Sequence, residues 1–307
     1  MCGASIRKSR KWSTPKIYMR QIDSFFSQQS NQPLFHYTGI SSLLGMAKSN
    51  TLWASNVYCL NDSKEIVHAC DVLKSILGRR LAASSVEQET EFLQQVETWI
   101  DHCRFGVFSL FVFSLSTEPS LLSQWRSYTP HGKGVSIGFS PEMLTSLASR
   151  NNLKIAQCLY EQREHQELLE SLLEKLLITF RQSFHLIDTS QAHPSQKYHP
   201  FLEDFRGDVL QVLSVIKHRA FSEEREWRLI SPYYPKYTVP QIKFREGASM
   251  LIPYIELDLG ESKPIFSKVI LGPSPHQSLS MSTLSMLLSN QNLCNMTENS
   301  VLPYREW

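Results

Sequence analysis

The sequence predicts an α+β fold with a helical insertion, and three patterns predict it. Short apolar or alternating runs typical of strands recur along the chain, at 34–37, 52–55, 106–115, 135–139, 226–231, 251–258 and 266–271. Amphipathic helical patterns separate these runs, with apolar residues three and four positions apart. The strongest helical pattern, over 161–216, stands between two predicted strands and therefore predicts an inserted helical segment.

The composition is that of an ordinary globular protein. The 307 residues are 42% hydrophobic and 20% charged, and the formal net charge of +2 neither requires nor excludes a nucleic-acid partner. No run of about 18 apolar residues exists, so no membrane span is expected. The six cysteines form no C-x-x-C pair and no zinc-ligand spacing. We therefore expect free thiols in a reducing cytoplasm, and no metal.

The chain divides into three parts by its patterns. Residues 1–32 are rich in Ser and Gln and predict an N-terminal extension, whose basic cluster at 7–12 is followed by no apolar stretch and so predicts a solvated tail rather than a signal peptide. Residues 33–275 carry the strands and the insertion and predict the main domain. Residues 276–307 predict a C-terminal helix, near 282–289, and a tail.

Helices are predicted by stripes of apolar residues on one face. Ile40, Leu43, Leu44 and Ala47 form the first stripe, after a capping residue at Thr38 or Ser41. Two more follow the Asn61-Asp62 turn signal, one with Ile66, Cys70, Leu73 and Leu77, and one with Phe92, Val96, Ile100 and Cys103. The clearest covers 161–187, with Leu168, Leu172, Leu176 and Phe180 opposite three glutamates. Helical spacing also predicts one or two turns over 121–128 and a helix over 201–216.

The segment from Lys217 to Ile230 carries the strongest sign of chemistry. It predicts a strand, a short acidic turn and a second strand that begins near Glu226. Alternate side chains of a strand share a face, so Glu226, Arg228 and Ile230 point one way. Trp227 and Leu229 point the other way. This division predicts that one sheet face packs and the other lines a polar cleft, although a solvated Glu-Arg pair on a surface strand gives the same pattern.

Two further groups of residues have the chemistry of a ligand site. His36 and Tyr37 end a strand and project from opposite faces, and a neutral histidine there can donate a ring N–H to a ligand hydroxyl. Trp125 and Tyr128 are three residues apart and would share a helical face, where flat rings can stack on a nucleobase or nicotinamide. The Gly-Lys-Gly run at 132–134 is not a phosphate loop and predicts a hairpin turn. The motifs G-x-G-x-x-G, G-x-S-x-G and H-E-x-x-H are absent.

Taken in order, these segments resemble a bacterial family classed as a domain of unknown function. The resemblance covers roughly residues 33–272 and rests on Phe35-His36-Tyr37-Thr38, Leu52-Trp53-Ala54-Ser55, Asn61-Asp62, Phe113-Ser114, Trp125 with Tyr128, Gly134 to Phe139, and Lys217 to Arg228. Family members often carry a proline and an acidic residue after Asn-Asp. Ser63 and Lys64 stand there in this chain, which leaves a direct role for the turn without support.

That family in turn resembles the ADP-ribosyltransferase superfamily, which implies a single mixed β-sheet core and NAD as the substrate. By this resemblance His36 would hold the nicotinamide ribose, and Glu226, or its neighbour Glu224, would stabilise the ribose as nicotinamide leaves. Tyr37, Trp125 or Tyr128 would stack on the nicotinamide. Thr38 and Arg228 would complete the NAD-contacting set. Arg228 would also keep the carboxylate ionised and reach the pyrophosphate, with Lys217 and Arg219 as further phosphate contacts.

The leading hypothesis is therefore an NAD-consuming ADP-ribosyltransferase or NAD glycohydrolase that needs no metal and no membrane. The resemblance implies a bacterial toxin or an antiphage defence effector, with protein, nucleic acid, a small molecule or water as the acceptor. A second hypothesis is a metal-free ribonuclease that uses His36, His218 and Glu226. A third is a non-enzymatic module whose cleft holds a ligand or partner. The sequence gives no prediction of the oligomeric state.

Overall fold

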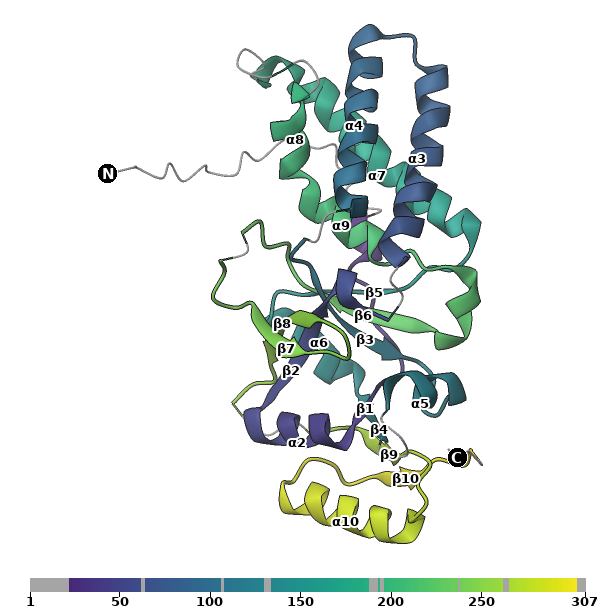
Figure 1. Ribbon diagram of the computed structural model, residues 1–307, viewed down its shortest axis with the longest axis vertical. Coiled ribbons are helices and arrows are strands. Elements are labelled where there is room, and N and C mark those ends of the chain that lie inside the picture. The colour runs from purple at the N-terminus through teal and green to yellow at the C-terminus, as the bar shows by residue number, and fades with distance from the viewer. Residues whose placement is uncertain are drawn as a thin grey trace, which may run out of the picture.

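Within residues 22–61, 64–105, 108–129, 134–187, 193, 196–236, 238–261 and 265–302, which the computed structural model of the protein describes, ten strands join into one mixed sheet (Figure 1). The strands are β1 (Leu34–Gly39), β2 (Thr51–Asn56), β3 (Phe111–Ser116), β4 (Gly134–Phe139), β5 (Lys154–Gln157), β6 (Glu226–Ile230), β7 (Lys243–Glu246), β8 (Leu251–Asp258), β9 (Lys268–Leu271) and β10 (Thr297–Asn299). Neighbouring strands run antiparallel, apart from the parallel pair β9 and β10. The α+β class and the single mixed sheet are thus as the sequence predicted.

The sheet is split beside β3, and this split places the candidate site. One edge of β3 pairs continuously with β6, from Val112 opposite Ile230 to Ser116 opposite Glu226. The other edge meets β2 only at its start, through Phe111 and Val112, and β1 only at its end, through Ser116. The central residues 113–115 therefore have no paired residue on that edge. β1 and β2 diverge here, and the helix α2 (Ile40–Ser49) joins them.

Helices cover both faces of the sheet. One face carries a lobe built from α3 (Glu65–Ala83), α4 (Glu87–Phe105), α7 (Gln162–Ser183), α8 (His199–Asp204) and α9 (Arg206–Leu213), in the upper half of Figure 1. The lobe has its own aromatic core, in which the Phe92 and Phe180 rings stack 3.9 Å apart. The other face packs on α2, α6 (Pro141–Arg150) and α10 (Gln277–Asn290). Short elements complete the fold: α5 (Leu122–Tyr128), and the 3₁₀ turns η1 (Val57–Cys59), η2 (Phe184–Leu186) and η4 (Arg219–Glu224).

The predicted alternation along β6 is confirmed. Trp227 and Leu229 lie in the apolar core beneath α2 and α6, while Ile230 packs on the opposite face with the helical lobe. Glu226 and Arg228 share the face of Ile230 and are buried. The apolar stripes predicted for α3, α4 and α7 are buried as well, because their fourth-residue spacing turns one side of each helix toward the lobe core.

Three predicted elements need correction. The strand predicted at Lys217 is replaced by η4, because the Lys217 N–H bonds to the Leu159 carbonyl and the chain then turns tightly up to Glu224. Residues 106 and 107 of the strand predicted over 106–115 lie outside the described residues, and within the described part the strand begins at Phe111, since Ser109 makes a single isolated bridge to Tyr234. The short helix predicted at 282–289 is the longer α10.

Both ends of the described chain contribute to the fold. Ile22 and Phe26 are buried against the lobe, and Ser27 bridges to Ile155. At the other end β10 adds to the sheet beside β9. The basic cluster at 7–12, Asp62 of the turn signal and the 131–133 run lie outside the described residues.

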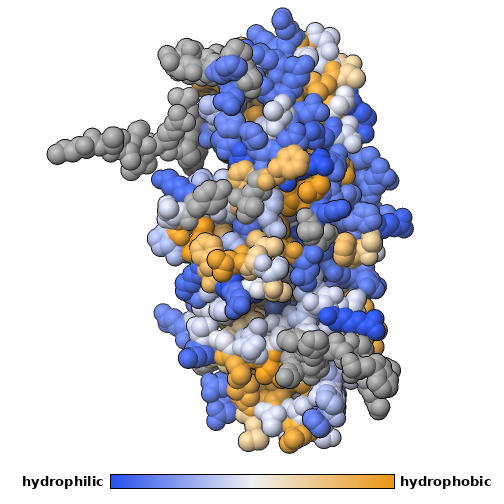
Figure 2. All heavy atoms as spheres, viewed as in Figure 1, coloured by the Kyte–Doolittle hydropathy of each residue, from blue (hydrophilic) through white to orange (hydrophobic). Residues whose placement is uncertain are grey.

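The surface differs between the two halves (Figure 2). Hydrophilic residues dominate over the helical lobe, whereas apolar residues gather at the opposite end, where Leu279 and Met286 of α10 are exposed. Among the described helices, none combines the length and the apolar character needed to cross a bilayer.

Candidate functional site

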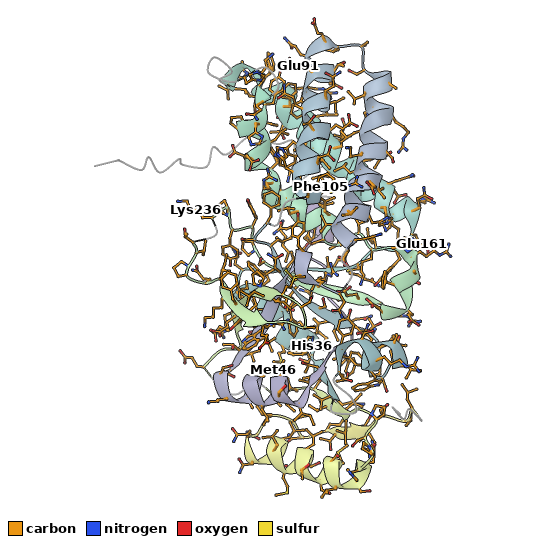
Figure 3. The ribbon with its side chains drawn as sticks, in the orientation of Figure 1. His36, Met46, Glu91, Phe105, Glu161 and Lys236 are labelled. Carbon is orange, nitrogen blue, oxygen red and sulfur yellow. The ribbon has the colours of Figure 1, made fainter. Side chains whose placement is uncertain are left out.

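A hollow of about 690 Å³ opens where the sheet splits. Its lining comes from β1, α2, β2, the middle of β3, the start of α3, α5, η4, β6 and the β7–β8 hairpin. Figure 3 shows His36 of β1 and Met46 of α2, both of which line the hollow, in the half of the molecule below the helical lobe. Its lining combines apolar side chains such as Met46 and Phe113 with polar ones such as His36 and Glu224. The split therefore converts the middle of the sheet into a ligand-sized cavity.

A buried network of ion pairs forms one end of the hollow. The Arg228 guanidinium donates through Nε to Glu226 at 2.7 Å and through Nη2 to Glu65 at 3.0 Å. Lys217 places its Nζ 2.6 Å from Glu224 and 2.6 Å from Glu226. Three carboxylates and two cations thus meet beside β6, and all of them except Glu224 are buried. Such charges are tolerated only because each has a partner.

Glu226 is fully engaged inside this network. Burial alone would raise the pKa of Glu226, but Arg228 and Lys217 outweigh that effect and lower the pKa to about 2. One carboxylate oxygen accepts from Arg228, the other accepts from Lys217 and Arg228, and the residue is only 5% exposed. A ligand would have to break an ion pair to reach this carboxylate.

Glu224 is placed differently, although it lies only two residues away. Its side chain is 13% exposed, and within the described chain its carboxylate has one ion-pair partner, Lys217, which lies 2.6 Å from one of the two oxygens. Burial is the largest influence on Glu224 and raises its pKa, against the opposing effect of Lys217. The left-handed backbone of Arg225, with φ of 42°, turns the chain between the two glutamates so that both reach Lys217. Glu224 is consequently the carboxylate that faces the hollow with an oxygen to spare.

His36 is neutral and its proton position follows from geometry. The ring stacks on Phe113 at 4.3 Å, and Nδ1 lies 2.9 Å from the Ser114 carbonyl oxygen. Burial lowers the pKa of His36 to about 4, while the bond to Ser114 opposes the shift. A carbonyl only accepts, so Nδ1 carries the proton and Nε2 is an acceptor. The expectation that His36 donates to a ligand hydroxyl is corrected: its free nitrogen would accept from one.

His36 and Glu226 reach the hollow from opposite faces of the sheet. Phe113, on which His36 stacks, lies in the core under α2, whereas Ser114 pairs with Arg228 on the other face. In a continuous sheet these faces would be separated by backbone. The split between β1 and β3 opens a passage, and both residues line it.

Three of the predicted ligand contacts with rings or hydroxyls line the hollow, and they differ in how exposed they are. Tyr128 is 39% exposed and lines the hollow, and Tyr37 and Thr38 line it while largely buried. The Tyr37 hydroxyl is occupied, since it donates to the Glu118 carbonyl at 2.6 Å and accepts from the Leu121 N–H at 2.9 Å.

The prediction for Trp125 needs correction. Trp125 is 2% exposed, does not line the hollow and packs edge to face on Tyr37, 4.8 Å away. Its indole N–H bonds to Ser120 at 3.1 Å. The i, i+3 spacing puts Trp125 over β1 and leaves Tyr128 at the helix end, where it meets the cavity. Trp125 is therefore a core residue and cannot stack on a ligand.

Two lining residues were missed by the sequence interpretation. Trp53 is 46% exposed on β2, between the buried Leu52 and Ala54, and its ring packs against Tyr254 at 4.5 Å. Arg245 on β7 donates to the Ser55 hydroxyl at 3.2 Å. In the sequence, Trp53 stands between two apolar residues of a predicted strand, and strand alternation could have identified it as a tryptophan that points away from the core. Arg245 gave none, because no strand was predicted there.

Other candidate residues lie away from the hollow. No described residue of 161–216 lines it, so the helical insertion builds the lobe and not the cavity wall. Arg219 is exposed and faces Glu161 at 3.6 Å. His218 contacts the ring of His68 at 5.4 Å and does not line the hollow, so the acid–base pair of the ribonuclease hypothesis is not assembled with His36. Within the described chain, no three His, Cys, Asp or Glu side chains are grouped to hold a metal ion.

One part of the chain matches a known protein family. Residues 124–229, from α5 to β6, match the sequence model of a family described as "Protein of unknown function (DUF2971)". The matched stretch contains Tyr128, Glu224, Glu226 and Arg228, and it excludes His36. No curated protein and no solved structure matches the chain.

Proposed function

We propose that the hollow binds NAD and that the protein cleaves the bond between nicotinamide and ribose, as an ADP-ribosyltransferase or NAD glycohydrolase. The observation that carries the proposal is the single cavity of about 690 Å³ lined together by neutral His36, Tyr128 and the partly open carboxylate of Glu224. Cavities of roughly 300–1,000 Å³ accommodate ligands of this size.

The proposed step needs a fixed negative charge beside the ribose. When the C1′–N bond breaks, its electron pair leaves with nicotinamide and the ribose becomes positively charged. Glu224, which Lys217 holds in place and which is only 13% exposed, would stabilise that charge better than water does. The acceptor then supplies an electron pair to C1′ and loses a proton to solvent. The Nε2 atom of His36 would accept a hydrogen bond from a ribose hydroxyl and orient the sugar.

Glu226 takes a supporting role in this proposal. The expectation from the sequence placed Glu226 ahead of Glu224 as the catalytic carboxylate, and the proposal reverses that ranking. Its ion pairs fix Lys217 and Arg228, and Lys217 in turn holds Glu224. Tyr128 is the stacking ring of choice, because Trp125 is in the core and the Tyr37 hydroxyl is engaged. The acceptor, whether protein, nucleic acid, small molecule or water, decides between transfer and hydrolysis. A role as toxin or antiphage effector follows only from the resemblance.

The test is nicotinamide release from NAD by the purified full chain. Glu224→Gln should reduce the rate by about 10²–10³-fold, the usual cost of removing a group that stabilises transition-state charge, and leave the melting temperature close to that of the unmodified protein. The matched control is Glu223→Gln, because Glu223 is an exposed neighbour that does not line the hollow. Equal rates for the two variants would remove Glu224 from catalysis. If the unmodified protein neither binds NAD nor releases nicotinamide with any acceptor class, the proposal fails.

A non-enzymatic binding module is the second candidate, and the locked state of Glu226 favours it. A carboxylate with both oxygens in ion pairs and 5% exposure suits a structural role. This candidate predicts that NAD binds and is recovered unchanged after long incubation with protein, nucleic-acid and water acceptors. Nicotinamide release that depends on Glu224 would rule it out.

A further inference from the structure

The charges that line the hollow are unevenly distributed. Lys217 and Arg228 face three carboxylates at the β6 end, those of Glu65, Glu224 and Glu226. Arg245, in contrast, contacts a neutral hydroxyl and has no carboxylate within ion-pair distance in the described part of the chain. The cavity thus has an excess negative charge at one end and an uncompensated positive charge at the other.

The strand register explains how Arg245 reaches the cavity. Arg245 stands opposite Ile252 of β8, and Tyr254 of β8 stands opposite Ser55 of β2. These residues share one face of the sheet, so the arginine extends across β8 toward Ser55. Trp53, two residues before Ser55, faces the same side and keeps nearly half of its surface open. A cation, a hydroxyl and an indole are therefore grouped on the β2–β7 wall.

We propose that Arg245 and Ser55 form an anion-recognition site for the phosphates of a nucleotide ligand, with Trp53 as the surface on which its base stacks. A guanidinium matches two phosphate oxygens in a bidentate arrangement, and the hydroxyl adds a third donor. A tryptophan beside such a cation offers a flat apolar face to any nucleobase. Arg245 can exchange its weak neutral contact for a phosphate without leaving a carboxylate unpaired.

The inference rests on the proposed function and gives NAD a direction in the cavity. The positively charged nicotinamide ring would lie at the Glu224 end, and the pyrophosphate and adenosine would lie at the Arg245 end. Charge complementarity at both ends then fixes the orientation. Reversing the ligand would place phosphate at the end where three carboxylates outnumber two cations, which like-charge repulsion opposes.

The experiment compares two substitutions on the same strand. Arg245→Gln removes the cation that lines the cavity, and Lys243→Gln removes a cation that pairs with Glu256 at 2.7 Å outside it. Calorimetry on the full chain measures binding of ADP-ribose, which has phosphates, and of nicotinamide riboside, which has none. We expect Arg245→Gln to weaken ADP-ribose binding by about 10–100-fold, as lost hydrogen bonds to a charged group do, and to change nicotinamide riboside binding less than about twofold. Lys243→Gln should change neither, and Arg245→Lys should recover part of the loss.

The outcomes separate this inference from the proposed function. Arg245-dependent binding of ADP-ribose or pyrophosphate, without any nicotinamide release from NAD, upholds the anion site and rejects the catalytic proposal. Nicotinamide release with an unchanged KM in Arg245→Gln rejects the anion site and upholds catalysis. Equal losses of both probes in Arg245→Gln, or equal losses in the Arg245 and Lys243 variants, also overturn the inference.

Discussion

The two ends of the hollow use charge in opposite ways. At the β6 end, five charged groups, four of them buried, are joined by ion pairs, and the arginine at their centre is as inaccessible as any core residue. At the β7 end, a single arginine contacts one hydroxyl and faces the cavity. The number of charges at a site therefore does not identify a binding residue. A charge that is already paired maintains the shape of the site, while a charge without an ionic partner is free to take a ligand.

The paired end is energetically the more demanding. Moving a charge from water into the protein interior costs several kcal/mol, which only close partners offset. Arg228 is hydrogen-bonded to Glu65, Glu226 and the Ser214 carbonyl, so it ties α3, β6 and the segment after α9 together. The network therefore connects the helical lobe to the sheet at the β6 end of the hollow.

The largest expected effect comes from breaking the paired end. Arg228→Met leaves Glu65 and Glu226 buried without their main partner and should lower the free energy of unfolding by about 3–5 kcal/mol. Urea denaturation measures this. The control Arg163→Met removes an exposed arginine that pairs with Glu167 on α7 and should cost less than about 1 kcal/mol. Similar costs for both would mean that the buried network does not stabilise this end. Adding Glu65→Gln and Glu226→Gln to Arg228→Met should restore part of the loss.

The second effect is a pH dependence that originates at His36. Its folded pKa of about 4 lies below the usual 6.5, so the unfolded chain binds a proton between these values and the folded chain does not. Stability from this residue is complete above pH 6.5 and is lost as the pH falls toward 4, by at most about 3 kcal/mol because the ring partly faces the hollow. His36→Asn should reduce the dependence of the unfolding free energy on pH between about 4 and 6.5. His185→Asn, at an exposed histidine of η2, should leave it unchanged. If the unfolding free energy changes with pH equally in the two variants, a buried neutral His36 is contradicted.

The smallest expected effect concerns the two aromatic rings, one at each end of the hollow. Tyr128→Leu should weaken nicotinamide riboside binding, and Trp53→Leu should weaken AMP binding, each by about 1–3 kcal/mol of lost stacking. Each substitution should spare the other ligand, because the rings stand at opposite ends of the proposed ligand. Calorimetry with both ligands on both variants gives the four values needed. Losses that do not depend on the ligand would mean that the ends are not specialised.

Local periodicity was enough to predict much of the fold. The period of two along residues 226–230 assigned each side chain to the correct face, and the stripes through Leu73 and Phe92 located α3 and α4. β7 was missed, because Lys243-Phe-Arg-Glu is a short, largely exposed edge strand without an apolar pattern. The supposed strand at Lys217 failed for a tertiary reason, since one backbone bond to Leu159 is followed at once by a 3₁₀ turn.

Part of the hollow's lining was predictable from the sequence, but the contacts that its residues make were not. Sequence singled out His36, Glu224, Glu226 and Tyr128, all of which line one hollow. The ranking of the two glutamates depends on the left-handed turn at Arg225 and on a lysine that reaches both. The proton position on His36 depends on the Ser114 carbonyl, which is available only because the sheet splits. Neither feature produces a periodic pattern in the sequence.

Two borders of the sheet are protected by different means. β7 ends one side as a four-residue strand that carries a lysine, an arginine and a glutamate, and charged short borders resist pairing with other chains. On the other side, β9 is covered by β10, the last strand described. Truncating the protein before Thr297 would uncover a row of backbone groups on β9 and invite a second molecule to add its own strand. A fusion tag is thus better placed after β10 than substituted for it.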